Sequence, residues 1–327
     1  MLTASDILTL PYDPQFSRAG VQYACESLHF TYNRMGLDIP RRMTKIVAGI
    51  AFEMGMRRWL EAEGIPYNRL GATPFTQPDL FDLALGGRRC DLKSYLIYND
   101  KNIAALHADA GWALEAEALV PDDQFASDRM NEHDLYVFGF ATAPRPADAA
   151  EARGPGYFVH TPPAAQWANI LQWQSLGPLA LKSNADRPLT VEIGGQDSTR
   201  AAVRERLPLP PRTRVPAQRD YFTVLYLAVP NPPQAQLGLH SPALGKPHIV
   251  EPKHWSNVWL NGQRLYLCGW INKHDFRRDC RLLVAGTPVR QYPRLATDNR
   301  ALPMNHLRPM RELAELARQH AAGQRGV

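Results

Sequence analysis

The sequence has few cysteines, no long apolar run and only a weak imbalance of charge. Its four cysteines lie far apart and form no C-x-x-C pair, which argues against a zinc knuckle and indicates a reducing compartment. No apolar segment is long enough to predict a membrane span, and no signal peptide is recognisable. We therefore expect a cytoplasmic protein that makes no membrane contact.

Length and charge leave several classes of protein open. A chain of 327 residues can form one large or two modest domains with ample core. The net charge of +5 and the pI near 9.0 are a mild basic bias. Such a bias suits a nucleic-acid partner without establishing one.

Residues 78–95 contain the pattern around which the rest of the sequence is interpreted. Gly86 and Gly87 separate two alternating runs, which is typical of a two-residue β-hairpin turn. In that register Leu85 faces Arg88, and side chains alternate between the two faces of the hairpin. One face then carries Phe81, Leu83, Leu85, Cys90 and Leu92, all of which are apolar.

The other face of this hairpin is acidic. The register places Asp82 directly opposite Asp91, and Lys93 shares the face of Asp91. Two opposed carboxylates repel each other, and a divalent cation such as Mg²⁺ or Mn²⁺ is the simplest compensation, because both prefer hard oxygen ligands. The alternative interpretation is a surface hairpin that carries polar residues on its solvated face.

Glu53 is the best candidate for a further ligand. It lies in a predicted helix that starts near Thr44 and stops at Gly64. The apolar residues of this helix are Val47, Ile50, Ala51, Met54, Trp59 and Leu60. A helix that is apolar on one side and carries Glu53 could bring a third carboxylate to the hairpin.

The order of these elements resembles the PD-(D/E)XK, or restriction-endonuclease-like, nuclease superfamily. The matching residues are Glu53 on a helix, Asp82 on a strand and the run Asp91-Leu92-Lys93 on the next strand. Asp79, in the literal Pro-Asp pair, is the reserve for the first acid, although the hairpin register favours Asp82. The resemblance covers roughly residues 40–143 and resumes near 264–286.

This resemblance implies a fold class, a reaction and a set of roles. The fold is α/β, with an αβββαβ core and a mainly β insertion. The activity is metal-dependent hydrolysis of phosphodiester bonds, with DNA favoured over RNA and either internal or terminal cutting. Glu53, Asp82 and Asp91 bind Mg²⁺ or Mn²⁺, and Lys93 is the catalytic lysine. A role in bacterial restriction or phage defence rests on family analogy alone.

Other functions remain open at this point. The same fold can carry an idle site in a nucleic-acid-binding protein, or serve as a subunit of a larger assembly. Cutting both strands of DNA with one site per chain requires two chains or two events. A homodimer or a protein partner is therefore among the expected partners.

The chain divides into three predicted parts: residues 1–143, 144–260 and 261–327. The first holds helices over residues 16–35 and 103–120 and a buried strand over 135–142. The second is a mainly β insertion. Its strands are predicted at 157–160, 189–193, 223–229, 236–239 and 258–260. The third returns to the core with a strand over 265–271 and ends in an amphipathic helix.

Several arginines are candidate phosphate contacts. Arg57 and Arg58 follow Glu53 by one helical turn, and Arg89 lies in the hairpin. Within the insertion, Arg204, Arg212 and Arg214 belong to a stretch, residues 200–219, that is predicted as an exposed loop or a short helix followed by extended chain. The alternative is that these arginines are solvated or bind acidic patches of their own fold. His240, His248 and His254 match no metal-ligand spacing.

Overall fold

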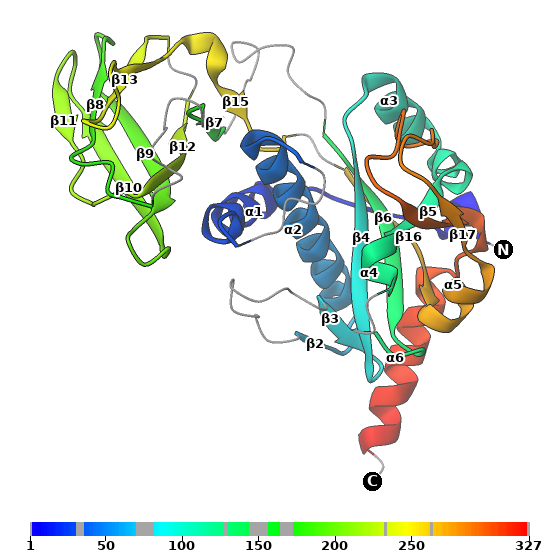
Figure 1. Ribbon diagram of the computed structural model, residues 1–327. Coiled ribbons are helices and arrows are strands. Elements are labelled where there is room, and N and C mark those ends of the chain that lie inside the picture. Colours follow the sequence, from blue (N-terminus) through cyan, green and yellow to red (C-terminus); the bar gives the residue numbers. More distant parts are fainter. Residues whose placement is uncertain are drawn as a thin grey trace. The chain divides into compact units, whose positions relative to one another are not determined.

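The computed structural model describes residues 2–30, 36–69, 82–126, 130–143, 156–163, 173–231, 234–261 and 264–325 (Figure 1). Asp79 and Phe81 lie outside these ranges. The chain is mixed α/β and forms two compact units. The first unit comprises Met1–Gly20, Ala48–Arg145 and Gly262–Val327, and the second comprises Val21–Val47 and Pro146–Asn261. In the described part of the chain, every helix is too short or too polar to span a bilayer.

The helices begin and end where side chains cap them or the chain turns. They are α1 (Pro14–Ser27), α2 (Ile39–Ala62), α3 (Asp100–Ala108), α4 (Asp122–Ala126), α5 (Lys273–Asp279) and α6 (Met310–Arg325), with 3-10 helices η1 (Ala4–Asp6), η2 (Ala110–Glu115), η5 (Pro252–His254) and η6 (Met304–His306). Helix α2 starts earlier than the predicted Thr44 because the side chain of Asp38 accepts a hydrogen bond from the N–H of Arg41. Helix α1 ends at Ser27, well before the predicted Met35.

A six-stranded sheet forms the centre of the first unit. In spatial order its strands are β1 (Leu8–Leu10), β16 (Arg264–Asn272), β6 (Leu135–Thr142), β4 (Arg88–Ile97), β3 (Leu83–Leu85) and β2 (Tyr67–Arg69). Strands β4 and β6 are parallel, and the other neighbours are antiparallel. A smaller sheet contains β17 (Arg281–Leu283), β18 (Asn299–Pro303) and β5 (Glu117–Pro121).

Strand β6 is buried along its whole length, which confirms the predicted strand over residues 135–142. Phe52 of α2 packs against Gly139, where a Cβ would approach the Phe52 ring to 2.5 Å. On the other face, Phe138 and Phe140 join a cluster that includes Trp112 and Phe276. Helices on both faces therefore enclose the central strands (Figure 1).

The hairpin between β3 and β4 has the predicted turn and register. Gly86 and Gly87 have φ values of 55° and 73°, as a two-residue turn of this hand requires. Leu85 pairs with Arg88, and Leu83 pairs with Cys90. Helix α6 packs on the turn, because a Cβ on Gly87 would lie 2.9 Å from the ring of His320.

The second unit is built from two antiparallel sheets around one core. One sheet contains, in order, β10 (Ala202–Leu209), β9 (Leu189–Gln196), β12 (Thr223–Val229), β7 (Phe158–His160) and β15 (Ser256–Asn257). The other contains β11 (Arg214–Pro216), β8 (Ala180–Ser183), β13 (Leu237–His240) and β14 (His248–Val250). Both sheets contribute to the core, for example through Ile193 and Leu239.

Three predicted elements are wrong. The helix over 103–120 breaks into α3, η2 and β5, because Asp109 ends α3 and its side chain then caps η2 at Gly111. Much of the arginine-rich stretch 200–219 is strand, since β10 pairs with β9 along its full length. Residues 258–260 form no strand. The strand in this region is β15, whose residues Ser256 and Asn257 pair with β7.

Candidate active site

Asp82 lies just before β3, where the regular ladder with β4 ends at Leu83–Cys90. Its backbone N–H donates to the carbonyl of Cys90 at 3.1 Å, and its Oδ2 accepts from the N–H of Leu92 at 2.7 Å. The backbone of Asp82 thus bonds the residue before Asp91, and its carboxylate bonds the residue after it. The two aspartates are adjacent, although Asp82 has left the regular register that the sequence predicts.

Asp91 and Lys93 are two residues apart in β4, with Leu92 between them, and therefore lie on the same face of the strand. The Nζ of Lys93 is 2.6 Å from Oδ2 of Asp91 and 3.0 Å from Oε1 of Gln124. Gln124 comes from α4, and Arg300 fixes this helix by bonding Asp122 at 2.7 Å. No sequence pattern singles out Gln124, which lies in a polar stretch before the buried strand β6.

Glu53 lies on α2 and forms an ion pair with Arg57, one turn later on the same helix. The side chains are 16% and 23% exposed, so the pair is largely removed from water. A second contact joins the guanidinium to the hairpin: Nη2 of Arg57 lies 3.4 Å from the carbonyl oxygen of Asp82. Arg57 therefore connects the helix that carries Glu53 with Asp82, which directly precedes β3.

Negative charge accumulates around Asp82. Burial, followed by the charges of Asp91 and Glu53, raises the pKa of the Asp82 carboxyl to about 8. The hydrogen bond from the N–H of Leu92 and the charge of Lys93 oppose this rise in pKa. The carboxyl group of Asp82 is thus surrounded by protein, whereas other atoms of the residue are partly accessible to water. An added cation beside Asp82 would favour its ionised form.

The three carboxylates bind groups of their own unit, and they do not point toward one common position. Among the residues that the structure describes, no group of three or more His, Cys, Asp or Glu side chains is arranged to hold a metal ion. Arg57 engages Glu53 and Lys93 engages Asp91. The donor types nevertheless fit Mg²⁺ or Mn²⁺, because all three are carboxylates and the buried Asp82 lies in the field of the other two.

The other two candidate arginines of the first unit make structural contacts. Arg58 binds Asp13 at 2.9 Å and lies over the ring of Phe16, with 5.4 Å between the guanidinium carbon and the ring centre. Arg89 binds the buried Asp134 through Nε at 3.1 Å and through Nη2 at 2.7 Å. Arg57, in contrast, contacts the carboxylate site through Glu53 and the carbonyl oxygen of Asp82.

The candidate arginines of the second unit also have partners there. Arg204 lies 3.5 Å from Glu26 and 3.9 Å from Glu192. Arg212 pairs with Asp186 at 2.7 Å, and Arg214 contacts the ring of His240. Arg204 and Arg212 thus bind acidic groups of their own fold, as in the alternative interpretation, whereas the contact of Arg214 is a histidine. Their role in nucleic-acid binding stays a prediction.

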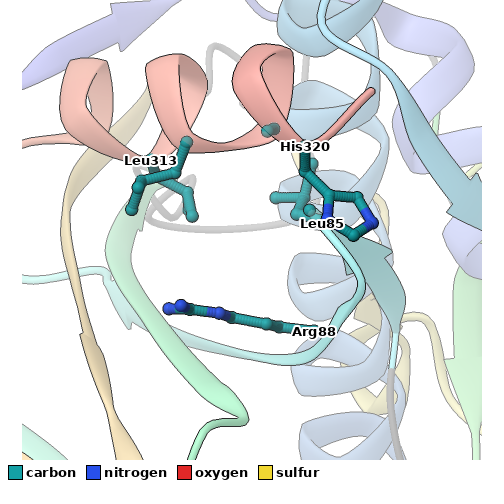
Figure 2. A pocket seen from close by; sticks show the side chains of 7 residues that line it. Leu85, Arg88, Leu313 and His320 are labelled. Carbon is teal, nitrogen blue, oxygen red and sulfur yellow. The ribbon is translucent and has the colours of Figure 1, made fainter. Parts of the chain in front are cut away.

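A small pocket lies at the hairpin turn, away from the carboxylates. Its volume is about 110 Å³, and it is lined by Leu85, Gly86, Arg88, Leu313, Leu316, Ala317 and His320. Figure 2 shows Leu313 and His320 of α6 beside the hairpin residues Leu85 and Arg88. Leu85 belongs to the apolar face of the hairpin, so this pocket offers no group to the acidic face.

Two buried histidines form a pair in the second unit. The Nε2 atoms of His160 and His248 are 2.8 Å apart, and Nδ1 of His160 lies 3.0 Å from the carbonyl oxygen of His254. Burial lowers the pKa of both, to about 4 for His248. The sequence draws attention to His248 and His254 but not to His160, whose position in β7 matches no ligand spacing.

The chain was compared with known proteins at the levels of family, sequence and fold. No family model, curated protein or solved structure matches it. The candidate site therefore rests on its own geometry and on the sequence pattern.

Proposed function

We propose that the protein is a divalent-metal-dependent nuclease that acts on DNA through Glu53, Asp82, Asp91 and Lys93. The observation that carries the proposal is the position of Asp82. Its carboxylate binds the N–H of Leu92 between Asp91 and Lys93, and its pKa is raised by burial and by the charges of Asp91 and Glu53. A cluster of carboxylates beside a lysine suits a cation and a phosphate group.

The order of the elements supports a restriction-endonuclease-like core. Helix α2 with Glu53 is followed by β2, β3 and β4, then by α3 and finally by β6. Strand β6 lies beside β4 in the same sheet and runs parallel to it. This order corresponds to αβββαβ, with β5 and α4 added before the last strand.

In this proposal Glu53, Asp82 and Asp91 hold Mg²⁺ or Mn²⁺. When bound, the ion supplies Lewis-acid stabilisation of negative charge and acidifies a water molecule. Lys93 contributes a fixed positive charge, because Asp91 and Gln124 hold its Nζ at 2.6 Å and 3.0 Å. This ammonium can orient the attacking water or neutralise charge that develops on the phosphate.

DNA is the favoured substrate, and restriction or phage defence is the favoured setting. The mild basic charge supports a nucleic-acid partner of either kind. Double-strand cleavage by one site per chain would involve a homodimer, a protein partner or two successive events. The second unit, with its separate core, would select the substrate or the partner.

The test is a cleavage assay on linear, circular and single-stranded DNA and on RNA, in Mg²⁺, Mn²⁺ and EDTA. Wild type is compared with Asp91→Ala and Lys93→Ala. Asp279→Ala and Lys101→Ala are matched controls, because both residues are exposed on helices of the first unit. We expect metal-dependent cleavage by wild type and both controls, and a loss of at least about 100-fold in the two site variants.

A nucleic-acid-binding protein with an idle site is the second candidate. The ion pairs of Glu53 with Arg57 and of Asp91 with Lys93 favour it, because both carboxylates are already neutralised. In that case wild type and Asp91→Ala would bind DNA equally and neither would cleave it. Equal inertness on every substrate would therefore overturn the nuclease proposal.

A further inference from the structure

Arg57 contacts two parts of the candidate site at once. Its guanidinium forms the ion pair with Glu53 and also bonds the carbonyl of Asp82 at 3.4 Å. Its Nε atom is buried and has no hydrogen-bond partner within the described residues. A guanidinium has five N–H donors in a planar fork, so Arg57 retains donor capacity that the described residues do not use.

A divalent cation and Arg57 cannot both bind the Glu53 carboxylate without each weakening the binding of the other. Both are positively charged, and Glu53 lies only 16% exposed, where repulsion between them is weakly screened. The two residues are four apart on α2, so a change of side-chain rotamer in Arg57 is enough to separate them without moving the helix.

We infer that Arg57 is an exchangeable counter-ion: it competes with the divalent cation for Glu53, and once displaced it binds a phosphate of the nucleic acid. The inference rests on the proposed function. Arg57 is a positioning and phosphate-binding residue in this scheme, and it sets the metal affinity of the site. The guanidinium fork matches two phosphate oxygens, which would also satisfy the buried Nε.

Arg58 provides a matched control. It is the same residue type at the next position of the same helix, but its side chain is 54% exposed and binds Asp13 instead of the carboxylate site. Replacing either arginine by glutamine removes one positive charge from α2. Only the Arg57 variant removes a charge that touches Glu53.

The experiment titrates Mn²⁺ into wild type, Arg57→Gln, Arg57→Lys and Arg58→Gln by calorimetry at pH 8, without nucleic acid. We expect Arg57→Gln to bind Mn²⁺ about tenfold more tightly than wild type and Arg58→Gln to match wild type. Arg57→Lys keeps the charge and should stay close to wild type in metal affinity. Thermal unfolding of each variant verifies that it is folded.

The second measurement is DNA binding in Ca²⁺ as a function of salt. Arg57→Gln should bind more weakly, with the slope of log K against log salt reduced by about 0.9, the contribution of one phosphate contact. Arg58→Gln should keep the wild-type slope. An arginine that only supports the fold would instead weaken both metal and DNA binding when it is removed.

The outcomes separate this inference from the nuclease proposal. If wild type binds Mn²⁺ and cleaves DNA but Arg57→Gln binds the metal no more tightly, the counter-ion role is overturned and the nuclease proposal stands. If Arg57→Gln and Arg58→Gln change the salt slope equally, the phosphate role is overturned. If wild type binds no Mn²⁺ and cleaves nothing, both proposals fail together.

Discussion

The ammonium of Lys93 lies between two acceptors, 2.6 Å from Oδ2 of Asp91 and 3.0 Å from Oε1 of Gln124. The first acceptor comes from the same strand and is charged, whereas the second comes from α4 and is neutral. A lysine side chain has four flexible torsions, so two acceptors are needed to fix the position of its charge. The orientation of Lys93 thus depends on α4, which lies outside the sequence motif.

Replacing Gln124 by alanine should reduce cleavage without abolishing metal binding. The variant loses one hydrogen bond to a charged group, which is worth about 1.5–3 kcal/mol and corresponds to a loss of roughly 10- to 100-fold in kcat. Single-turnover kinetics and Mn²⁺ titration measure the two effects separately. Gln124→Glu restores an acceptor and should recover part of the rate. Wild-type kcat in Gln124→Ala would contradict the positioning role.

Asp82→Asn should stabilise the protein at alkaline pH in EDTA. The folded-state pKa of Asp82 is raised to about 8, so the fold favours the protonated carboxyl. Its contribution to stability is fully present below pH 4 and is lost as the pH rises through 8. Asparagine stays neutral and can still accept from Leu92, so the variant should gain roughly 1–3 kcal/mol at pH 8.5 and little at pH 5. Urea denaturation at both pH values is the measurement, and an equal difference at both would refute the assignment.

Gly87→Ala should destabilise the first unit by about 1–2 kcal/mol. The φ of 73° disfavours any side chain, and the new Cβ would lie 2.9 Å from the His320 ring. The double variant Gly87→Ala/His320→Ala separates these costs, because it removes the contact and keeps the backbone strain. Thermal unfolding should show a smaller penalty for Gly87→Ala in the His320→Ala background than in wild type. An identical loss of stability in both backgrounds would mean that the contact between the new Cβ and the His320 ring costs nothing.

Asp134→Ala should be among the most destabilising single substitutions in the first unit. Asp134 is 4% exposed and accepts hydrogen bonds from Arg89 and from the N–H of Asn131 at 2.7 Å. Removing the carboxylate leaves two backbone N–H groups without their acceptor, whereas water can partly compensate the guanidinium of Arg89, which is 34% exposed; the expected cost is about 2–3 kcal/mol. Urea denaturation measures the loss, and Asp279→Ala serves as the exposed control. A change below about 1 kcal/mol would contradict the structural role of the pair.

The second unit should lose stability in mild acid. Burial lowers the pKa of His248 to about 4, with the charge of His160 a further cause, so the fold favours neutral rings. This contribution to stability is present above pH 6.5 and is lost as the pH falls toward 4, by about 1–2 kcal/mol at pH 5. His248→Gln should lose less stability between pH 7 and pH 5 than wild type, measured by urea denaturation. His274→Gln, at an exposed histidine, is the control and should behave as wild type.

Local chemistry made the hairpin predictable from sequence. Adjacent glycines specify the turn, and once the turn is fixed, alternation assigns each residue of 83–93 to a face. The strand 135–142 was predictable for a related reason, because a fully buried central strand is apolar throughout. In both cases the signal is contained within a few consecutive residues.

The remaining features depend on contacts between distant segments. Nothing in the sequence near Gln124 indicates that it reaches Lys93, 31 positions earlier. Alternating Arg204 and Arg206 suit a strand only when β9 offers an edge to pair with, and an isolated arginine-rich segment favours a loop. The departure of Asp82 from the ladder depends on the hydrogen bond of its side chain to Leu92, which residue spacing does not encode.

The chain passes between the two units at four places, close to residues 20, 47, 145 and 261. Deleting residues 146–261 alone would therefore not remove the whole second unit. Residues 21–47 would stay behind and lose partners such as Tyr157, whose hydroxyl lies 3.4 Å from Sγ of Cys25. The passage near residue 47 falls inside α2 (Ile39–Ala62), so removing residues 21–47 as well would cut a continuous helix.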